Sequence, residues 1–385
     1  MQIEKFSSGS YINQRGFKSF IPVGINSSWS WESPEINVLL EHASNELGGL
    51  DSYSGLIPNI DIYIQMHIRI EANKSSKIEG TKTSIEEEMM NIEDIAPEKR
   101  DDYEEVRNYI DAMNYGIDRM QKESFPLTTR LMREMHSILM RGVRGEHKTP
   151  GEFRTQQNWI GGTMPSNAIY VPPDVDNLHE LLSDFEKFIH NDNIQVPHLI
   201  KIALIHYQFE TIHPFQDGNG RIGRLIIPLY LLDKGILSKS CFYISDYFEK
   251  NRTAYYDALQ NVRDKSDLKS WIVFFLKAII QTAKSGKHKF KNAVNLVNKY
   301  EELILEFSGR SDKNMSILRA FFIEPILTGK QLQEKLSLSQ PAIDKTVKAM
   351  LDNNMLHEIT GYSRNRIYVL KDYFRVFAND FIEDE

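Results

Sequence analysis

Apolar residues recur at helical spacing along most of the chain, and three stretches are apolar on nearly every face. Residues 199–209 are too apolar for a surface helix, which predicts a buried one. Residues 222–234 have the same character and stop at Gly235, a residue suited to the left-handed position after a helix. A third buried helix is expected to begin near Asn59, because its apolar positions are too many for one exposed stripe: Ile62, Ile64, Met66, Ile68 and Ile70.

Other stretches carry more ordinary helix signals. A helix is expected from Pro34, which suits a first turn, to Leu47, where a pair of glycines follows. Ser84 and Glu87 form a capping-box pattern at the start of another helix. Residues 1–35 have no clear period and predict an irregular arm laid on the body. Further helical patterns occupy residues 96–116, 126–139, 252–262, 268–280 and 294–307.

The chain changes character beyond residue 308. Three helices and two β-favouring segments are expected there, in the order 315–322, 329–336, 340–350, 356–360 and 366–370. This order is typical of a winged helix-turn-helix. The sequence therefore predicts a mainly α-helical protein of three parts, residues 1–115, 116–307 and 308–385.

Composition narrows the class of protein. The chain has 385 residues, 41% of them hydrophobic, and a formal charge of −7, which argues against a general nucleic-acid-binding surface. Its single cysteine, Cys241, excludes an internal disulfide and suits a reducing compartment. No apolar run approaches the roughly 18 residues needed to span a bilayer, and residues 1–8 do not open a signal peptide. We therefore expect a cytoplasmic protein that does not enter a membrane.

Most of the candidate chemistry lies in residues 212–224, which connect the helix predicted at 199–209 to the helix predicted at 222–234. Pro214 ends the first of these helices because it lacks a backbone donor and biases the preceding residue away from the helical basin. The backbone N–H groups of Gly218, Asn219 and Gly220 would then point into a concavity at the positive end of the next helix. Such a concavity is an anion hole.

The side chains of this loop complete the chemistry. Arg221 and Arg224, three residues apart, offer two forks that can hold phosphate oxygens bidentately. Asp217 is a hard oxygen ligand suited to a Mg²⁺ ion that bridges those phosphates. His213, with an ordinary pKa of about 6.5, is the natural general base for a protein hydroxyl. Phe215 is expected to face inward and anchor the loop.

Residues 218–223 also fit the G-x-G-x-x-G pattern of dinucleotide-binding folds. That fingerprint requires a preceding strand and, about twenty positions further on, an acidic residue at the end of a second strand. Here a long apolar helix precedes the pattern, and residues 240–246 show no such unit. We therefore reject a dinucleotide site.

The loop resembles the active-site motif of the Fic family, His-x-Phe-x-Asp/Glu-Gly-Asn-Gly-Arg-x-x-Arg, and matches every defined position from His213 to Arg224. The resemblance implies a Fic-type helical bundle that transfers AMP from ATP to a Ser, Thr or Tyr hydroxyl of a protein and releases pyrophosphate. Family members that transfer other groups commonly depart from the motif, whereas Gly220 is intact here. Residues 116–307 would be the catalytic domain, with the long helical stretch up to residue 307 connecting it to the last part, and residues 1–115 an N-terminal module.

Residues 75–80 extend the resemblance. Taken alone, Glu79 is expected to be a solvated surface residue. Ser75 and Glu79 are four apart on one helix face and are followed by Gly80, as in the family's inhibitory Ser/Thr-x-x-x-Glu-Gly/Asn helix. The resemblance implies that Glu79 pairs with Arg224 and takes the guanidinium group that the γ-phosphate of ATP needs.

Two β-favouring runs, residues 151–162 and 168–173, predict a hairpin joined by a glycine-containing loop. The resemblance makes this hairpin a flap that holds the target protein by β-augmentation between Trp159 and Tyr170, although a purely structural hairpin stays open. The resemblance also places part of an adenine pocket near Asn251.

For the C-terminal part we expect protein recognition or homodimerisation rather than DNA binding. From Arg310 to Glu385 there are eleven Lys and Arg against eleven Asp and Glu, which is not the basic footprint that phosphate binding requires. A local basic patch remains open, formed by Lys345, Lys348, Arg364 and Arg366. Other readings of the whole chain are a hydrolase that removes AMP with Glu79 orienting a water, a non-catalytic winged-helix regulator, and a toxin–antitoxin scaffold.

Overall fold

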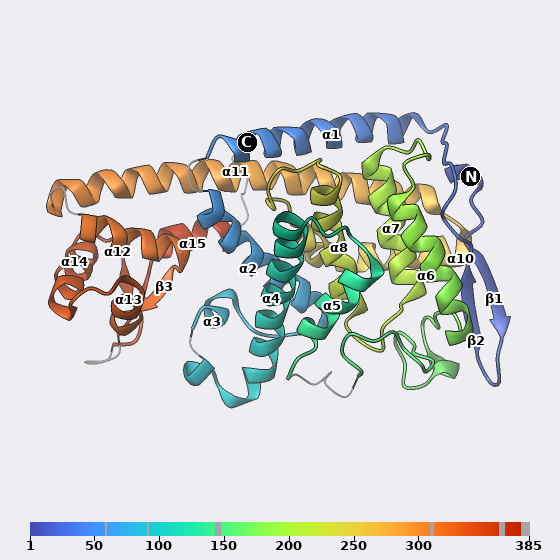
Figure 1. Ribbon diagram of the computed structural model, residues 1–385, viewed down its shortest axis with the longest axis horizontal. Coiled ribbons are helices and arrows are strands. Elements are labelled where there is room, and N and C mark those ends of the chain that lie inside the picture. Colours follow the sequence, from blue (N-terminus) through green and yellow to red (C-terminus); the bar gives the residue numbers. More distant parts are fainter. Residues whose placement is uncertain (58–59, 91, 143–147, 309–311, 362–365, 379–385) are drawn as a thin grey trace.

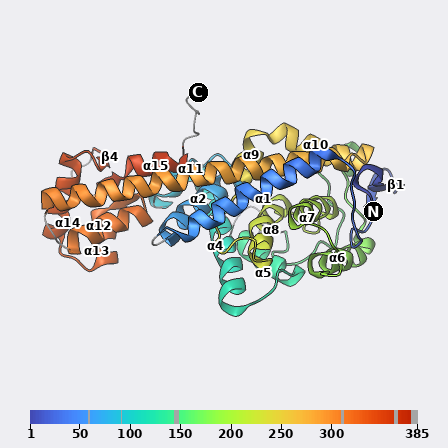
Figure 2. The same cartoon turned by 90° about the horizontal axis from the view of Figure 1, so that it is seen from above.

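The computed structural model describes residues 1–378 except for 58–59, 91, 143–147, 309–311 and 362–365. The described chain is mainly helical, as predicted, and the molecule is elongated (Figure 1). Helix α11 (Leu268–Ser308) runs along the long axis as one helix of 41 residues and joins the stretches predicted at 268–280 and 294–307. Helix α1 (Pro34–Gly55) lies along α11 in both views (Figure 1, Figure 2).

The predicted end of the first helix at Leu47 is wrong, because α1 continues through the two glycines to Gly55. Leu47, Leu50 and Ser54 of this stretch are buried, whereas Gly48 is exposed. A Cβ on Gly286 of α11 would lie 3.2 Å from Cδ1 of Leu50, so the two helices approach closely here. This packing outweighs the low helix propensity of glycine.

The expectation of an irregular arm is also wrong in part. Strands β1 (Gly9–Asn13) and β2 (Lys18–Pro22) form an antiparallel hairpin. Phe20 of β2 is buried, its ring centroid lies 6.2 Å from that of Tyr170, and its N–H donates to the carbonyl of Val171 at 2.9 Å. The hairpin is thus stabilised by contacts with a distant segment, which a local pattern does not reveal.

In the described part of the chain, nine helices follow α1 and precede α11, and two of them, α7 (His198–Ile212) and α8 (Asn219–Asp233), are the buried helices predicted on either side of the motif. Every residue of α7 from Leu199 to Ile212 is buried, and α8 is buried over most of its length although it contains Pro228. The other seven are α2 (Ile60–Glu79), α3 (Ile85–Glu88), α4 (Arg100–Glu123), α5 (Thr129–Leu139), α6 (Val175–His190), α9 (Ser245–Lys250) and α10 (Arg252–Lys265). The described residues also include short 3₁₀ turns at η1 (Ile3–Lys5), η2 (Ile92–Asp94), η3 (Pro97–Lys99) and η4 (Pro165–Asn167).

The C-terminal unit contains the three predicted helices and both predicted strand regions, with an additional strand and an additional helix. Its elements are α12 (Asp312–Ile323), β3 (Ile326–Thr328), α13 (Gly329–Leu336), α14 (Gln340–Asp352), β4 (His357–Glu358), β5 (Ile367–Val369) and α15 (Lys371–Ala378). The three strands form an antiparallel sheet in the order β3-β5-β4. This arrangement is compatible with a winged helix-turn-helix. Arg364 of the suggested basic patch lies outside the described residues.

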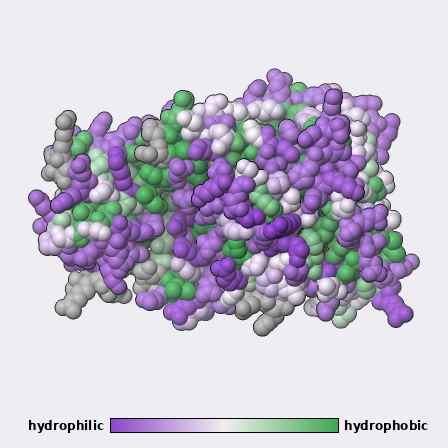
Figure 3. Space-filling model, in the orientation of Figure 1, coloured by the Kyte–Doolittle hydropathy of each residue, from purple (hydrophilic) through white to green (hydrophobic). Residues whose placement is uncertain are grey.

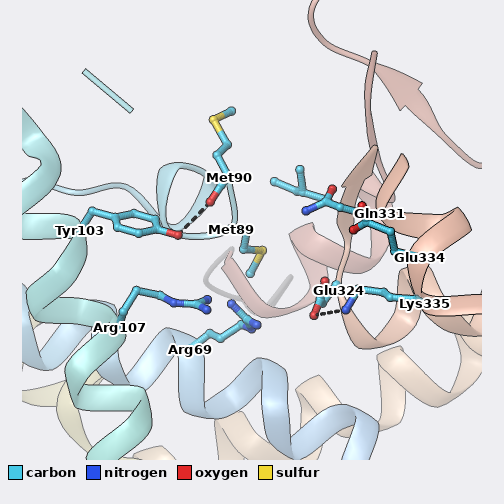
Figure 4. A pocket seen from close by; sticks show the side chains of 10 residues that line it. Arg69, Met89, Met90, Tyr103, Arg107, Glu324, Gln331, Glu334 and Lys335 are labelled. Carbon is cyan, nitrogen blue, oxygen red and sulfur yellow. Dashed lines mark hydrogen bonds and ion pairs between the residues drawn. The ribbon is translucent and has the colours of Figure 1, made fainter. Parts of the chain in front are cut away.

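The expected boundary between residues 115 and 116 falls inside α4, which packs on both α2 and α5. The C-terminal unit contacts α2 through α12 and α15. A cavity of about 440 Å³ lies beside this contact. Arg69 of α2 and Arg107 of α4 point into it, opposite the ion pair of Glu324 with Lys335 (Figure 4).

Among the described residues, no helix combines the length and the apolar character that crossing a bilayer requires. Figure 3 shows hydrophilic and hydrophobic residues intermingled on the face it displays.

Candidate active site

His213 lies at the end of α7 in the left-handed conformation, with φ 51° and ψ 60°. Its N–H still donates to the carbonyl of Phe209 at 2.9 Å, so the helix closes at this residue and the chain then turns away. Burial, with smaller contributions from Arg263 and Arg154, lowers the pKa of His213 to about 3. The imidazole is therefore neutral at pH 7 and able to accept a proton, and a bound polyphosphate would raise its basicity.

The carbonyl of His213 is held by the segment that leads into the predicted flap. It accepts hydrogen bonds from Nε of Arg154 at 3.0 Å and from Nδ2 of Asn158 at 3.2 Å. Asn158 also donates to the carbonyl of Phe215 at 2.8 Å, and the N–H of Arg154 donates to the carbonyl of Pro214 at 2.9 Å. These contacts could not be predicted from the sequence, where Arg154 and Asn158 are assigned only to a hairpin.

Asn219 closes the loop with its side chain. Its Nδ2 donates to the carbonyl of Phe215 and its Oδ1 accepts from the N–H of the same residue, both at 2.8 Å. The ring of Phe215 is buried and stacks on His136, with ring centroids 3.9 Å apart. The side chain of Asn219 thus shapes the loop, while its backbone N–H lies in the first turn of α8, where the helix supplies no acceptor.

Helix α8 begins where the motif predicts, but one of its three expected backbone donors is already engaged. Gly218 is the residue before the helix and has φ 72°. Its N–H donates to Oδ1 of Asp217 at 2.6 Å and is therefore already engaged. The N–H groups of Asn219 and Gly220 remain at the positive end of the helix.

Asp217 is exposed, and its backbone carbonyl lies 3.0 Å from Nε2 of His136. Among the described residues no cluster of three or more His, Cys, Asp or Glu side chains could hold a metal ion. A single carboxylate fits Mg²⁺ where substrate phosphates and water supply the other ligands, which is the common arrangement for this ion. Asp217 fits that role, and it would not form a metal site by itself.

Both arginines of the motif already have acceptors. Nη1 of Arg221 lies 3.2 Å from Oε2 of Glu105 on α4. Arg224 donates from Nε to Oγ of Ser75 at 2.7 Å and from Nη2 to the carbonyl of Ser75 at 3.0 Å. Its Nη2 also donates to Oε1 of Glu79 at 2.6 Å. The structure thus brings the predicted inhibitory segment with Glu79 into contact with Arg224 of the motif, about 145 residues away in the sequence.

Charge and burial strengthen the contact between Arg224 and Glu79. The Arg224 side chain is 1% exposed and that of Glu79 34% exposed. Burial alone would raise the pKa of Glu79, but the nearby guanidinium of Arg224 outweighs it and holds that pKa below its usual value. A Cβ added at Gly220 would lie 2.3 Å from Oε1 of Glu79, so the carboxylate reaches the backbone of the motif itself.

Glu210 is a buried acid that the sequence analysis did not single out. It lies on α7, and a Cβ added at Gly223 would be 2.2 Å from its Oε1. Burial raises the pKa of Glu210 to about 7, with an opposing effect of Arg224. Glu210 directly follows residues 199–209, from which the buried helix was predicted. An acidic residue at the end of such an apolar stretch was the only sequence signal of a buried acid.

The predicted flap forms a looser hairpin than expected. Residues 151–162 and 168–173 pair through one antiparallel bridge, between Ile160 and Tyr170, and not through two strands. The backbone carbonyls of Pro172 and Pro173 bond to the side chains of Gln157 and Arg154 instead of to a partner strand. The hydrophobic side chains of Trp159, Met164 and Ile169 are exposed.

Asn251 lies between α9 and α10, where its Nδ2 donates to the carbonyl of Tyr247 at 2.9 Å. It lines a cavity of about 820 Å³ together with residues of α2, α9 and α11. Burial and then the negative charge of Glu79 raise the pKa of Tyr256 on α10 to about 12.

The chain matches two family models, one described as Fic/DOC family N-terminal over residues 38–118 and one described as Fic/DOC family over residues 126–231. Curated relatives include "Protein adenylyltransferase Fic" of Aedes aegypti, 30% identical over 217 residues, which are 55% of this chain and 38% of the relative. The protein of the same name from Drosophila erecta is 32% identical over 136 residues, which are 35% of this chain and 26% of the relative. The chain thus spans well under half the length of these relatives.

Solved structures show the same fold. A Fic family protein from Desulfovibrio desulfuricans G20 superimposes with a TM-score of 0.54 at 20% identity, over 88% of this chain and 96% of that one. Fic-1 (aa134 - 508) from C. elegans gives a TM-score of 0.54 at 18% identity, over 68% of this chain and 75% of that one. The chain therefore carries a Fic/DOC family N-terminal region over residues 38–118 and a Fic/DOC family domain over residues 126–231, and it shares its fold with solved Fic family proteins.

Proposed function

We propose that the chain is a protein adenylyltransferase, which transfers AMP from ATP to a Ser, Thr or Tyr hydroxyl of a target protein or of itself and is inhibited by Glu79. The observation that carries the proposal is the motif loop. It presents a neutral His213, a helix N-terminus and two arginines on one short segment. Relatives that share the domain are named for this activity.

In the proposed reaction, the target hydroxyl oxygen attacks the α-phosphorus of ATP. The bond between the α-phosphorus and the bridging oxygen to the β-phosphate breaks, and pyrophosphate leaves. His213 takes the proton of the hydroxyl, which its neutral state permits. The first N–H groups of α8 and Arg221 stabilise the phosphate charge, and Arg224 binds the γ-phosphate once Glu79 has moved away. Asp217 would hold Mg²⁺, which would supply charge neutralisation at the phosphates.

Inhibition follows from competition for one guanidinium. Arg224 donates three hydrogen bonds to Ser75 and Glu79, all to acceptors on α2. A nucleotide that lacks this contact can still bind, with its α-phosphate misdirected for attack. The same contact disfavours a hydrolase in which Glu79 orients a water, because Oε1 of Glu79 is engaged with Arg224.

The target protein would dock at the flap between Trp159 and Tyr170, where Ile169 is 71% exposed. The C-terminal unit would serve protein recognition or homodimerisation, since its charges balance. We place the protein in the cytoplasm, and we retain residues 1–115, 116–307 and 308–385 as inhibitory module, catalytic domain and winged-helix domain. Asn251 stays a proposed nucleotide-pocket residue.

The function can be tested with ATP labelled at the α-phosphate or at the γ-phosphate. The chain is incubated with each nucleotide and a cell lysate, and labelled proteins are identified by mass spectrometry. Transfer of AMP predicts label from the α position alone. Label from the γ position alone indicates a kinase-like transfer and refutes the proposal. The regulator reading predicts no label in either case.

A further inference from the structure

His136 on α5 lies under the motif loop with both ring nitrogens engaged. Its Nδ1 accepts a hydrogen bond from the N–H of Gly151 at 2.8 Å, and its Nε2 lies 3.0 Å from the carbonyl oxygen of Asp217. Because Nδ1 is the acceptor, Nε2 carries the hydrogen and donates it to Asp217. The two contacts together fix one tautomer of a fully buried ring.

The ring is also fixed in its plane. It stacks on Phe215 with an interplanar angle of 8° and a centroid separation of 3.9 Å. A Cβ added at Gly218 would lie 3.4 Å from Nε2 of His136 and 3.0 Å from the sulfur of Met140, so the loop backbone rests directly on α5. His136 therefore has little freedom to turn.

The peptide unit between Asp217 and Gly218 passes this constraint to the carboxylate. A peptide unit is planar, so fixing the carbonyl oxygen of Asp217 also fixes the direction of the N–H of Gly218. That N–H donates to Oδ1 of the Asp217 side chain at 2.6 Å. A rigid path thus runs from the imidazole, through one peptide plane, to one carboxylate oxygen, and it leaves the second oxygen of an exposed residue for a ligand.

We propose that His136 is a positioning residue that aims the Asp217 carboxylate at the metal ion of the nucleotide complex. The inference rests on the proposed function, because it concerns the metal that Asp217 would bind with ATP. His136 itself touches neither metal nor substrate. Partners that orient a metal ligand typically change metal affinity about 10-fold to 100-fold when they are removed.

Two substitutions separate the contacts of the ring. In His136→Gln the amide nitrogen reaches the place of Nε2 and can still donate to Asp217, while the contact with Gly151 is lost. In His136→Asn the amide oxygen takes the place of Nδ1 and can still accept from Gly151, while the contact with Asp217 is lost. Each variant loses one buried hydrogen bond and the stacking, so their stabilities should be similar. His179→Asn, at an exposed position on α6, is the control for the substitution itself.

The measurement is Mn²⁺ binding by electron paramagnetic resonance, with the full chain, a non-hydrolysable ATP analogue and the Glu79→Gly background in every sample. We expect His136→Asn to weaken Mn²⁺ binding about 10-fold and His136→Gln to weaken it less than about 3-fold. The control should bind Mn²⁺ as the parent does, and the affinity for the analogue without metal should change less than about 2-fold in all variants.

Equal Mn²⁺ affinity of His136→Asn and the parent overturns the inference, and so does an equal loss in both His136 variants. A parent that takes up no Mn²⁺ with the analogue removes Asp217 as the metal ligand, a failure visible without any His136 variant. If the His136 variants do not fold, the parent protein alone still tests the inference. Nitrogen-15 spectra of its histidines must show His136 as the Nε2–H tautomer, and the other tautomer overturns the inference.

Discussion

Replacement of Glu79 by glycine is the sharpest test of how the site is regulated, and we expect it to raise the rate of AMP transfer at least about tenfold. Of the three hydrogen bonds that Arg224 donates to α2, two go to the neutral acceptors of Ser75 and one, at 2.6 Å, goes to the carboxylate of Glu79. Removing the carboxylate leaves the guanidinium in place and frees it for the γ-phosphate. It also clears the space beside Gly220.

The magnitude follows from this one contact. A hydrogen bond between charged groups contributes about 1.5–3 kcal/mol. Because the Glu79 side chain is 34% exposed, solvent screens it, and the lower end of that range applies. About 1.4 kcal/mol corresponds to a factor of ten in rate. A larger activation would mean that Glu79 also blocks the correct placement of the α-phosphate.

The assay is the initial rate of self-labelling and target labelling from α-labelled ATP. Glu79→Gln, which removes the charge at nearly constant volume, should activate as well. Ser75→Ala removes only a neutral acceptor and should change the rate less than about threefold. Arg224→Ala should not activate, because it removes the γ-phosphate ligand together with the partner of Glu79. Asp61→Gly, at an exposed site in the first turn of the same helix, controls for general loosening of α2.

Two outcomes refute this reasoning. If Glu79→Gly leaves the rate unchanged or abolishes transfer, Glu79 is a plain surface residue or a catalytic one. If Asp61→Gly activates as strongly as Glu79→Gly, the effect comes from a loosened helix and not from the missing carboxylate.

Three further results are expected. His213→Ala should fold and lose about 10²-fold to 10⁴-fold of the transfer rate in single-turnover measurements, and a folded variant with the parent rate removes His213 as the base. Asp217→Ala should shift the Mg²⁺ titration of activity to higher concentration, and superimposable curves remove Asp217 from the metal site. The contact of Glu79 with Arg224 is present above the ordinary carboxyl pKa of 4.5 and is lost only as the pH falls through the lowered pKa of Glu79. The ratio of the Glu79→Gly rate to the parent rate should therefore stay constant between about pH 6 and 8. A ratio that falls within this window contradicts the assignment.

DNA binding tests the C-terminal unit. The full chain should not shift a DNA duplex in a gel at low salt, because its C-terminal charges balance and few phosphate contacts are available. Tight binding that weakens with salt would revive the regulator reading.

The parts of the fold predicted from sequence are those set by local composition. Helices α7 and α8 are apolar on nearly every face, and only burial satisfies such a pattern. The hairpin of β1 and β2 escaped prediction because Phe20 finds its partner at Tyr170, far along the chain. The extension of α1 escaped it because Leu50, which follows the glycines, packs on Gly286 of another helix.

The candidate site likewise has a part that the sequence predicts and a part that only the fold reveals. The chemistry of the motif could be inferred from residue types within one loop, whereas the acceptors of its arginines lie on other helices. Nothing near Arg221 in the sequence indicates Glu105, 116 residues away. The contact between Glu79 and Arg224 was expected from family resemblance and not from any local pattern. Side-chain partners across helices depend on packing, which a single sequence specifies only through the complete fold.

How inhibition can be relieved follows from the way α2 is held. Upstream of Ser75, the buried carboxyl of Glu71 accepts hydrogen bonds from Tyr109 of α4 and from the N–H of Ser245 in α9. Still further upstream, Tyr63 packs on Tyr373 of α15. A shift of the whole helix would break these contacts together and leave Glu71 buried without partners, which is costly.

The last turn of α2 is different. It carries the partly exposed Glu79 and ends at Gly80, whose φ of 107° suits glycine alone. Its closing bonds are two backbone contacts, from Gly80 to the carbonyl of Lys77 and from Thr81 to that of Ser76. Unwinding this turn would expose the buried side chains of Ser76 and Ile78, but it would leave the hydrogen bonds of Glu71 in place and carry the carboxylate away from Arg224. We therefore expect an activating partner to act by fraying the end of α2, while the buried body of the helix stays in place.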